Sequence, residues 1–185
     1  MKLCKKFTQN EKIIIEKVII IKVVINAGHT KFDKGTGAIG KLSESIETRK
    51  IAYELMKQLS DTNHEVIPAV FDRSENNLKE AVDIANNNQA DLFISIHLNG
   101  GGGHGSEVYT WKGKQNTRAV KVCKNLSLLG FANRGVKDGS SLYVIKNTKC
   151  EAMLIEVCFV GSDIDYSLYT THGYTKIAKA IRESL

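Results

Sequence analysis

The sequence has few cysteines, and none lies in a metal-binding or redox pattern. Its 185 residues contain four, Cys4, Cys123, Cys150 and Cys158, and no two of them form a CxxC pair. Cys123 and Cys158 lie within apolar patterns, so we expect buried free thiols rather than a disulfide framework or a thiolate zinc site. This cysteine usage is typical of a protein made in a reducing compartment.

Long apolar runs are also missing. Near the amino terminus the uninterrupted apolar run covers only residues 18–21 and ends at Lys22. Such a run is too short for the apolar core of a signal peptide or for a membrane-spanning helix. We therefore expect a protein that is made in the cytoplasm without a signal peptide and that does not insert into a membrane.

The chain has fewer acidic than basic residues. The chain has 26 lysines and arginines against 20 aspartates and glutamates, for a formal net charge of +6. This excess favours an anionic partner, which could be a nucleic acid, a membrane surface or an acidic cell-wall polymer. No stacking aromatic motif accompanies the positive charge, so a nucleic-acid-binding protein is the weakest of the functional hypotheses.

What the sequence does contain is an alternation of apolar strands and amphipathic helices. With 42% hydrophobic residues, a chain of this length can form one domain around a sizeable core. Strands are predicted at residues 18–25, 65–71, 92–96, 107–111 and 152–160, with hairpin-like short strands within 133–147 that include 142–145. Helices are predicted at residues 43–59, 78–86, 119–129 and 174–185, and residues 12–17 either extend the first strand or form a separate one. This order predicts an α/β fold.

Three of the predicted strands carry polar, metal-competent groups at or near their ends. His97 follows the apolar run 92–96, His29 follows the first strand in the segment INAGHT, and Glu156 lies inside AMLIEVCFV. A single histidine at such a place is more often structural than catalytic. Ligands in open α/β sheets bind beyond the carboxyl ends of the strands, so three such groups together indicate a site at that edge. An ionised Glu156 buried in its apolar strand would need a compensating partner.

A fourth candidate, Glu44, lies at the start of the helix predicted from residue 43. The helix dipole favours a carboxylate there, and the glycine-containing loop of residues 30–41 can bring it to the same edge. Two alternatives stay open: Glu44 is an ordinary acidic residue of a first turn, or Glu47, three residues further on the same helix face, reaches a metal instead. His104 follows the glycine run 100–103 and is expected to be a rim residue rather than a ligand.

The four candidates together fit a catalytic zinc site. Two histidines, a carboxylate and an open position form the usual ligand set of such a site, and a second carboxylate nearby can accept the proton of a water molecule. His29, Glu44 and His97 fit the ligand roles, and Glu156 fits the role of the base. The chain has no HExxH motif on a helix, so the residue types indicate a metal hydrolase but their spacing does not establish one.

Six segments of the chain, in order, resemble the zinc-dependent N-acetylmuramoyl-L-alanine amidases of the Amidase_3 type: INAGHT, KLSESIETRK, DLFISIHLNG, GSEVYTW, GSSLYVIKNT and AMLIEVCFV. The resemblance covers residues 22–185, is especially close to endolysins of clostridial phages, and leaves residues 1–21 as an amino-terminal extension. It implies an α/β fold with a single twisted, mostly parallel sheet flanked by helices on both faces. By motif, His29, Glu44 and His97 correspond to the zinc ligands, and Glu156 corresponds to the catalytic glutamate.

The resemblance implies a zinc hydrolase that cleaves the amide between N-acetylmuramic acid and L-alanine in peptidoglycan. Such an enzyme would act on the cell wall after release from the cytoplasm. Its positive charge either attracts anionic wall polymers or is a solvated basic surface with no role, and nucleic acid is not the expected partner. Asn26 and Asn99, beside the two histidines, are candidates for binding substrate or for orienting ligands, with loop capping as an equal alternative. The alternative is a non-catalytic or decayed wall-binding module. The presence of all four candidate residues argues against decay.

Overall fold

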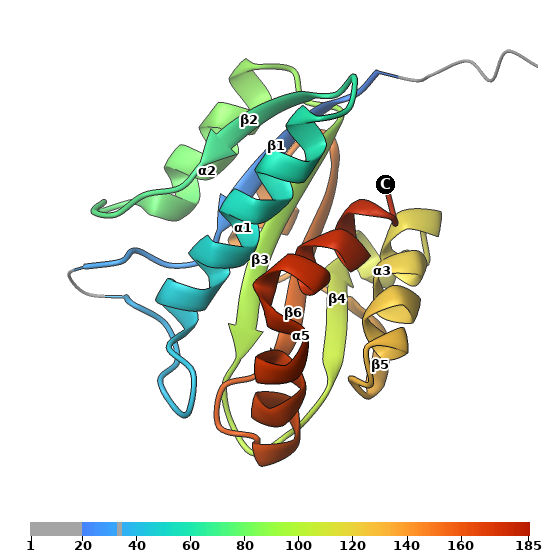
Figure 1. The fold of residues 1–185 in the computed structure, drawn as a ribbon. Coiled ribbons are helices and arrows are strands. Elements are labelled where there is room, and N and C mark those ends of the chain that lie inside the picture. The colour runs from blue at the N-terminus through green and yellow to red at the C-terminus, as the bar shows by residue number, and fades with distance from the viewer. Residues whose placement is uncertain (1–19, 33–34) are drawn as a thin grey trace, which may run out of the picture.

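A single sheet of six strands organises the chain (Figure 1). The computed structural model describes residues 20–32 and 35–185, so the prediction for residues 12–17 and the first part of the strand predicted at 18–25 lie outside the described residues. The strands are β1 (Lys22–Ala27), β2 (Glu65–Ala69), β3 (Leu92–Asn99), β4 (Ser106–Thr110), β5 (Asn133–Asp138) and β6 (Glu151–Phe159). Their order across the sheet is β2-β1-β3-β6-β4-β5.

Most of the strands run in the same direction. β1 pairs in parallel with β2 and β3, and β3 pairs in parallel with β6. β4 runs antiparallel to β6 and carries β5 parallel to itself. The predicted α/β fold with one mostly parallel sheet is therefore confirmed. Because β4 is reversed, its beginning lies at the edge where β1, β3 and β6 end.

Helices cover both faces of the sheet, as predicted (Figure 1). One face is covered by α1 (Glu44–Ser60), α3 (Thr117–Leu128) and α5 (Asp163–Arg182), the other by α2 (Asn77–Asn87) and α4 (Tyr143–Asn147), and a short 3-10 helix, η1 (Trp111–Gly113), follows β4. Side chains of a strand point alternately to the two faces. Val23 and Ile94 accordingly belong to the core under the first set of helices, whereas Val24 and Phe93 belong to the core under α2 and α4.

The same alternation decides where the polar strand-end groups lie. Ser95 and His97 are on the same face as Phe93, and Glu156 is on the same face as Leu154. α2 and α4 have only 11 and 5 residues, and the core that they share with the sheet contains Phe93 and Leu154. The polar groups therefore lie beyond these short helices, toward the carboxyl edge of the sheet.

The strand predicted at residues 142–145 is wrong, because Tyr143–Asn147 forms the helix α4. Val144 and Ile145 are the buried residues of this helix. Two adjacent apolar residues do not distinguish one helical turn from a short strand, so the local pattern was ambiguous. β5 lies in the same region but pairs in parallel with β4 and forms no hairpin with it.

The last helix is longer than predicted. α5 begins at Asp163, where the side chain of Ser162 accepts a hydrogen bond from the backbone N–H of Asp165 at 3.2 Å. Gly173 interrupts the helical backbone with φ 67° and ψ 166°. The predicted segment 174–185 covers only the part after this break, because the regular apolar stripe starts there.

Two expectations from composition can be compared with the described residues. Cys123, Cys150 and Cys158 are free thiols, and Cys123 and Cys158 are buried as predicted, while Cys4 lies outside the described residues. Burial raises the pKa of the Cys123 thiol to about 11, so it stays protonated. No helix in the described part of the chain is both long and apolar enough to cross a membrane.

Candidate metal centre

Two imidazoles and a carboxylate converge at the carboxyl edge of the sheet. His29 follows β1, His97 lies near the end of β3, and Glu44 opens α1. His29 Nε2 lies 3.2 Å from Glu44 Oε1, and His97 Nδ1 lies 3.0 Å from the same oxygen. One ligand atom from each residue lies within 4.8 Å of the others, and no other group of His, Cys, Asp or Glu does so in residues 20–32 and 35–185. We refer to His29, Glu44 and His97 as the metal centre.

Each imidazole has a separate partner on its other nitrogen. His29 Nδ1 lies 3.0 Å from the carbonyl oxygen of Gly35, and His97 Nε2 lies 3.1 Å from Ser95 Oγ. A carbonyl can only accept, so His29 Nδ1 carries a hydrogen and Nε2 is the nitrogen available to a metal. Metal-binding histidines usually have such a partner, which fixes the orientation of the ring. Both rings are therefore held with one nitrogen directed into the metal centre.

Asn26 completes a hydrogen-bond chain behind His97. Ser95 Oγ accepts from His97 and donates to Asn26 Oδ1 at 2.6 Å, while Asn26 Nδ2 donates to the carbonyl oxygens of Ala69 at 2.7 Å and Ala27 at 3.3 Å. Asn26 is 4% exposed, and both ends of its amide are engaged within the protein. Of the roles predicted for Asn26, this geometry favours orientation of a ligand over direct contact with substrate.

Glu44 is buried and held by backbone groups as well as by the two imidazoles. The backbone N–H of Ala38 donates to its Oε2 at 2.7 Å, and that of Leu98 donates to its Oε1 at 3.2 Å. Burial favours the protonated carboxyl, but hydrogen bonds with His29 and His97 outweigh this effect and hold the pKa of Glu44 well below its usual range. The hydrogen bond with Glu44 in turn raises the pKa of His29. Glu44 is thus an ionised carboxylate at neutral pH.

Glu47 faces different neighbours. Its Oε2 accepts a hydrogen bond from the Tyr169 hydroxyl at 2.7 Å, and its Oε1 accepts one from Lys50 Nζ at 2.9 Å. Of the two carboxylates considered from the sequence, the structure therefore brings Glu44 to the histidines and Glu47 to α5. His104 lies outside the metal centre and lines a surface hollow together with residues 101–103 and 161–164.

Two glycines leave space for the side chains of the metal centre. A Cβ on Gly28 would lie 2.4 Å from Cε1 of His97, and a Cβ on Gly37 would lie 2.5 Å from Glu44 Oε2. Gly37 also has a φ of +79°, which glycine adopts at little steric cost. A side chain at either position would displace one of the three converging groups.

Arg49 anchors the backbone of His29. His29 has a φ of 64°, in the left-handed region that is uncommon for residues with a side chain. Arg49 is 5% exposed, and its Nη2 donates to the carbonyl oxygens of Phe71 and, at 3.1 Å, of His29. Its Nη1 donates to the carbonyl oxygen of Ser45 at 2.6 Å, and its Nε donates to Asp72 Oδ1 at 3.3 Å. Arg49 was not among the residues predicted for the site, because no local pattern shows which distant carbonyls a helical arginine reaches.

Glu156 lies beside the metal centre on β6, where the register pairs it with His97. Burial raises the pKa of Glu156 to about 8, and the negative charges of Glu44 and Glu107 add to this effect. Its Oε2 is buried and has no hydrogen-bond partner among the described residues. Glu156 is not one of the three converging ligand groups, so this oxygen is available to exchange a proton.

A third carboxylate, Glu107, lies opposite Glu156 on the antiparallel strand β4. It is 3% exposed, and Arg134 Nε donates to its Oε2 at 2.8 Å. Asn99 Nδ2 and the Tyr109 hydroxyl donate to its Oε1 at 2.8 Å and 3.0 Å, so the structure ties Asn99 to Glu107. Glu107 was not among the residues predicted for the site. The only local signal was a charged residue next to Val108 and Tyr109 in a short strand.

The charges at this edge fit a bound cation. Glu44, Glu107 and Glu156 bring several carboxyl groups into one region, and Arg134 forms its ion pair with Glu107 alone. A divalent ion at Glu44 would offset negative charge that burial makes costly. Two imidazole nitrogens and one carboxylate oxygen, with a further position open, also match the ligands of catalytic metal sites. The donor set is therefore compatible with a metal ion.

Comparison with known proteins places the chain in a family. The family model described as N-acetylmuramoyl-L-alanine amidase, Amidase_3, matches residues 23–185. The chain belongs to this amidase family. The resemblance carried by the six ordered segments is thus confirmed.

Sequence relatives of this amidase-family chain occur in clostridia and bacilli. An uncharacterised protein of Clostridium perfringens (strain 13 / Type A) is 35% identical over 175 residues, which cover 89% of this chain and 51% of the relative. The sporulation-specific N-acetylmuramoyl-L-alanine amidase of Bacillus subtilis (strain 168) is 29% identical over 162 residues, which cover 84% of this chain and 62% of the relative. The chain therefore spans less than two thirds of the length of these curated relatives.

Solved structures of amidase catalytic domains share the fold. The catalytic domain of the CD27L endolysin targeting Clostridia Difficile matches with a TM-score of 0.80 and 29% identity, over 89% of this chain and 96% of that domain. The catalytic domain of CwlV, an N-acetylmuramoyl-L-alanine amidase from Bacillus (Paenibacillus) polymyxa var. colistinus, matches with a TM-score of 0.77 and 27% identity, over 89% and 96% of the two chains. The predicted similarity to endolysin catalytic domains is confirmed.

Proposed function

We propose that this chain is a zinc-dependent hydrolase that cleaves the amide between the lactyl group of N-acetylmuramic acid and L-alanine in peptidoglycan. Membership of the amidase family supports the substrate and the bond. The observation that carries the mechanism is the convergence of His29, Glu44 and His97 beside the unpartnered carboxyl group of Glu156.

The metal centre would hold the zinc ion. His29 Nε2, His97 Nδ1 and a carboxylate oxygen of Glu44 would be its protein ligands, and three ligands with an open position are typical of catalytic zinc sites. The chemistry that zinc supplies when bound is Lewis acidity, which lowers the pKa of water and polarises a carbonyl group. Ser95 and Asn26 keep the ring of His97 in the orientation that directs Nδ1 into the centre.

Glu156 would act first as the general base and then as the general acid. Its carboxylate accepts a proton from the attacking water as the water oxygen forms a bond to the amide carbonyl carbon. It then donates this proton to the nitrogen of L-alanine as the carbon–nitrogen bond breaks, which leaves a muramoyl carboxylic acid and a free amine. A pKa raised toward neutrality suits a group that performs both transfers.

Glu107 would set the proton affinity of Glu156. Its charge is stabilised by Arg134 and lies directly across the strand pair from Glu156. A like charge on the neighbouring strand disfavours ionisation of Glu156. Asn99 bonds to Glu107 from the partly exposed end of β3, and this position near the rim supports the proposal that it also contacts substrate.

Product analysis tests the proposed reaction. With zinc, the protein should lower the turbidity of purified clostridial walls and expose new amino-terminal L-alanine without new reducing sugars. A strong chelator should stop both effects, and added zinc should restore them. Glu156→Gln should reduce the rate at least about 10²-fold with its zinc content unchanged, because the three ligands are intact.

Two results would reject the proposal. Full activity in metal-free protein would show that the reaction does not need zinc. New reducing ends in place of new amines would show that the protein cleaves the glycan instead of the amide. Walls that are bound but never cleaved would support the alternative of a non-catalytic wall-binding module. The buried Oε2 of Glu156 argues against this alternative, because burying a polar group without a partner is costly and wall binding alone does not require it.

A further inference from the structure

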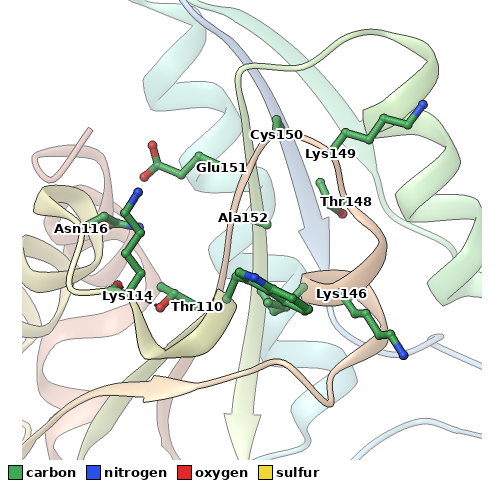
Figure 2. Close-up of a pocket in the computed structure, with 11 residues that line it drawn as sticks. Thr110, Lys114, Asn116, Lys146, Thr148, Lys149, Cys150, Glu151 and Ala152 are labelled. Carbon is green, nitrogen blue, oxygen red and sulfur yellow. Dashed lines mark hydrogen bonds between the residues drawn. The ribbon is translucent and has the colours of Figure 1, made fainter.

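A second hollow lies at the opposite edge of the sheet from the metal centre. Figure 2 shows the residues that line it. Its volume is about 470 Å³, and it lies between the end of β4 with η1 on one side and α4 with the start of β6 on the other. We name it the lysine pocket, and the residues that matter for its chemistry are Trp111, Lys114, Lys146, Thr148, Lys149 and Glu151.

The lysine pocket lies on the same face of the sheet as His97 and Glu156. Ala152 lines the pocket, and Glu156 lies four residues further along β6 on the same face. At about 3.3 Å per residue the two positions are about 13 Å apart along the strand. Leu154 lies between them and packs with Val144 and Ile145 of α4. α4 therefore separates the two sites.

Three lysines give the pocket positive charge without a carboxylate partner. Lys114, Lys146 and Lys149 are exposed, and none of them forms an ion pair with any residue that the structure describes. The acidic residue of the pocket, Glu151, is already paired with Arg118 Nη1 at 2.7 Å. Figure 2 shows Lys114 on one side of the pocket and Lys146 and Lys149 on the other. An anion that enters between them would interact favourably with both sides.

The wall of the pocket also carries buried polar atoms that lack a partner. Thr148 Oγ1 and Glu151 Oε1 make no hydrogen bond within the described part of the chain. Buried polar atoms nearly always have a partner, and rotation of either side chain would bring its oxygen to a ligand in the pocket. The Thr148 hydroxyl can donate to an oxygen, whereas the Glu151 oxygen can only accept. The matching ligand carries both acceptor oxygens and hydroxyl groups.

Trp111 adds a flat apolar surface at the rim. Trp111 is 45% exposed, and the ammonium group of Lys112 lies 5.9 Å from the centre of its ring. An indole ring offers a large rigid apolar face together with one polar N–H, a combination that is enriched at binding surfaces. Such a face can pack against the C–H groups of a sugar or a polyol.

We propose that the lysine pocket binds a phosphate-bearing polyol or sugar unit of a cell-wall polymer. Lysine binds phosphate as a point charge, and lysines on both sides of the pocket can contact a phosphate group that enters between them. The unpartnered oxygen of Glu151 and the face of Trp111 favour a hydroxyl-bearing unit over a bare anion. The choice of a wall polymer rests on the proposed function, but the binding of a polyol phosphate does not.

The fluorescence of Trp111 can report on this pocket directly, because the chain has one tryptophan. The full chain with zinc is titrated with poly(glycerol phosphate) and, separately, with inorganic phosphate at equal phosphate concentration. The polymer should change the emission at lower concentration, since inorganic phosphate lacks the polyol contacts. Lys114→Ala combined with Lys146→Ala and Lys149→Ala should weaken polymer binding at least about tenfold, because three charge-assisted contacts are lost.

A matched control removes the same charge elsewhere. Lys57, Lys121 and Lys124 are exposed and do not line the pocket. Their combined replacement by alanine should weaken binding by less than about twofold at physiological salt, where distant charges are screened. Both triple variants should keep the wild-type rate of hydrolysis on small soluble muropeptides.

Several outcomes would overturn the inference. Equal weakening of polymer binding in the two triple variants would show that net charge alone attracts the polymer. Binding of inorganic phosphate as tight as that of the polymer would show that the polyol makes no contacts in the pocket. If a single-stranded oligonucleotide binds more tightly than poly(glycerol phosphate), with the same dependence on the pocket lysines, the ligand of the pocket is a nucleic acid and not a wall polymer. Lysine-dependent binding of poly(glycerol phosphate) by a protein that cleaves no amide would instead reject the proposed function and support the pocket.

Discussion

Glu107 and Glu156 face each other across the antiparallel strands β4 and β6, but their surroundings differ. Arg134, Asn99 and Tyr109 all donate hydrogen bonds to Glu107, whereas Oε2 of Glu156 has no donor among the described residues. Burial, together with the charges of Glu44 and Glu107, raises the pKa of Glu156 to about 8, so Glu156 keeps its proton near neutral pH. This asymmetry is the physical reason for assigning proton transfer to Glu156.

Glu107→Gln should lower the pKa of Glu156, because it removes one of the negative charges that raise it. A general base must be ionised to act, so the acid limb of kcat/KM should move to lower pH. The measurement is kcat/KM against pH on a soluble muropeptide at constant zinc content. Glu151→Gln, at the far end of β6, is the control and should leave the acid limb in place. A shift toward higher pH in the Glu107 variant would contradict the assignment.

Glu156→Gln should stabilise the metal-free protein near pH 8 but not near pH 4. The folded chain raises the pKa of Glu156 from 4.5 to about 8, so the unfolded chain gives up this proton first as the pH rises. The folded state therefore loses stability between these two values, and above about pH 8 the loss is complete. Glutamine does not titrate, so the difference in unfolding free energy should grow by a few kcal/mol across this range. Urea unfolding with a chelator at several pH values measures it, and a difference independent of pH would argue against the buried, proton-retaining carboxyl group.

Glu44→Ala should abolish metal binding, whereas Glu47→Ala should keep it. Glu44 lies with the two histidines, while Glu47 accepts a hydrogen bond from Tyr169. Loss of that hydrogen bond should lower the free energy of unfolding by about 1 to 3 kcal/mol. Metal content per chain and thermal unfolding separate the two effects, and Glu44→Gln tests the metal ligand with the side-chain shape retained. Retention of metal by both Glu44 variants, with loss in Glu47→Ala, would reverse the assignment.

Arg49→Met should weaken metal binding although Arg49 is no ligand. The change removes donors to the carbonyl oxygen of His29, whose left-handed backbone they hold in place. A roughly tenfold loss of affinity is expected, as for groups that orient metal ligands, and Arg49→Lys should fall between wild type and Arg49→Met. Competition with a chromogenic chelator measures the affinity. Arg182→Met, which removes the same charge near the end of α5, should bind metal like the wild type. Equal affinities in all these proteins would refute the positioning role.

The sequence was sufficient to place His29, His97 and Glu156 at one edge of the sheet. Each lies in or directly after an apolar run, and alternating helices predict that such runs are parallel strands. Parallel strands bring their carboxyl ends to the same edge, so convergence there followed without knowledge of the strand order. The approach of Glu44 does not follow from the strands, because it depends on how the loop before α1 folds back.

Glu107 and Arg49 could not be placed from local patterns. Glu107 reaches the site only because β4 runs antiparallel to β6, and strand direction is a property of the whole sheet. Arg49 acts through carbonyl groups on three separate segments, at Ser45, His29 and Phe71. The helix α4 was mistaken for a strand because its pattern is too short to show a period.

The shared face of Glu156 and the lysine pocket has a consequence for how a polymer network would be degraded. Ala152 of the pocket and Glu156 beside the metal centre lie on the side of the sheet covered by α2 and α4, and β6 runs from one to the other. With the lysine pocket engaged as proposed, the protein is tethered to the wall with its metal centre turned toward the same layer. Each further encounter with a stem peptide is then intramolecular, at an effective concentration of about millimolar for a short tether. Successive cuts would fall close together, so that the wall would open in patches rather than through scattered single cleavages.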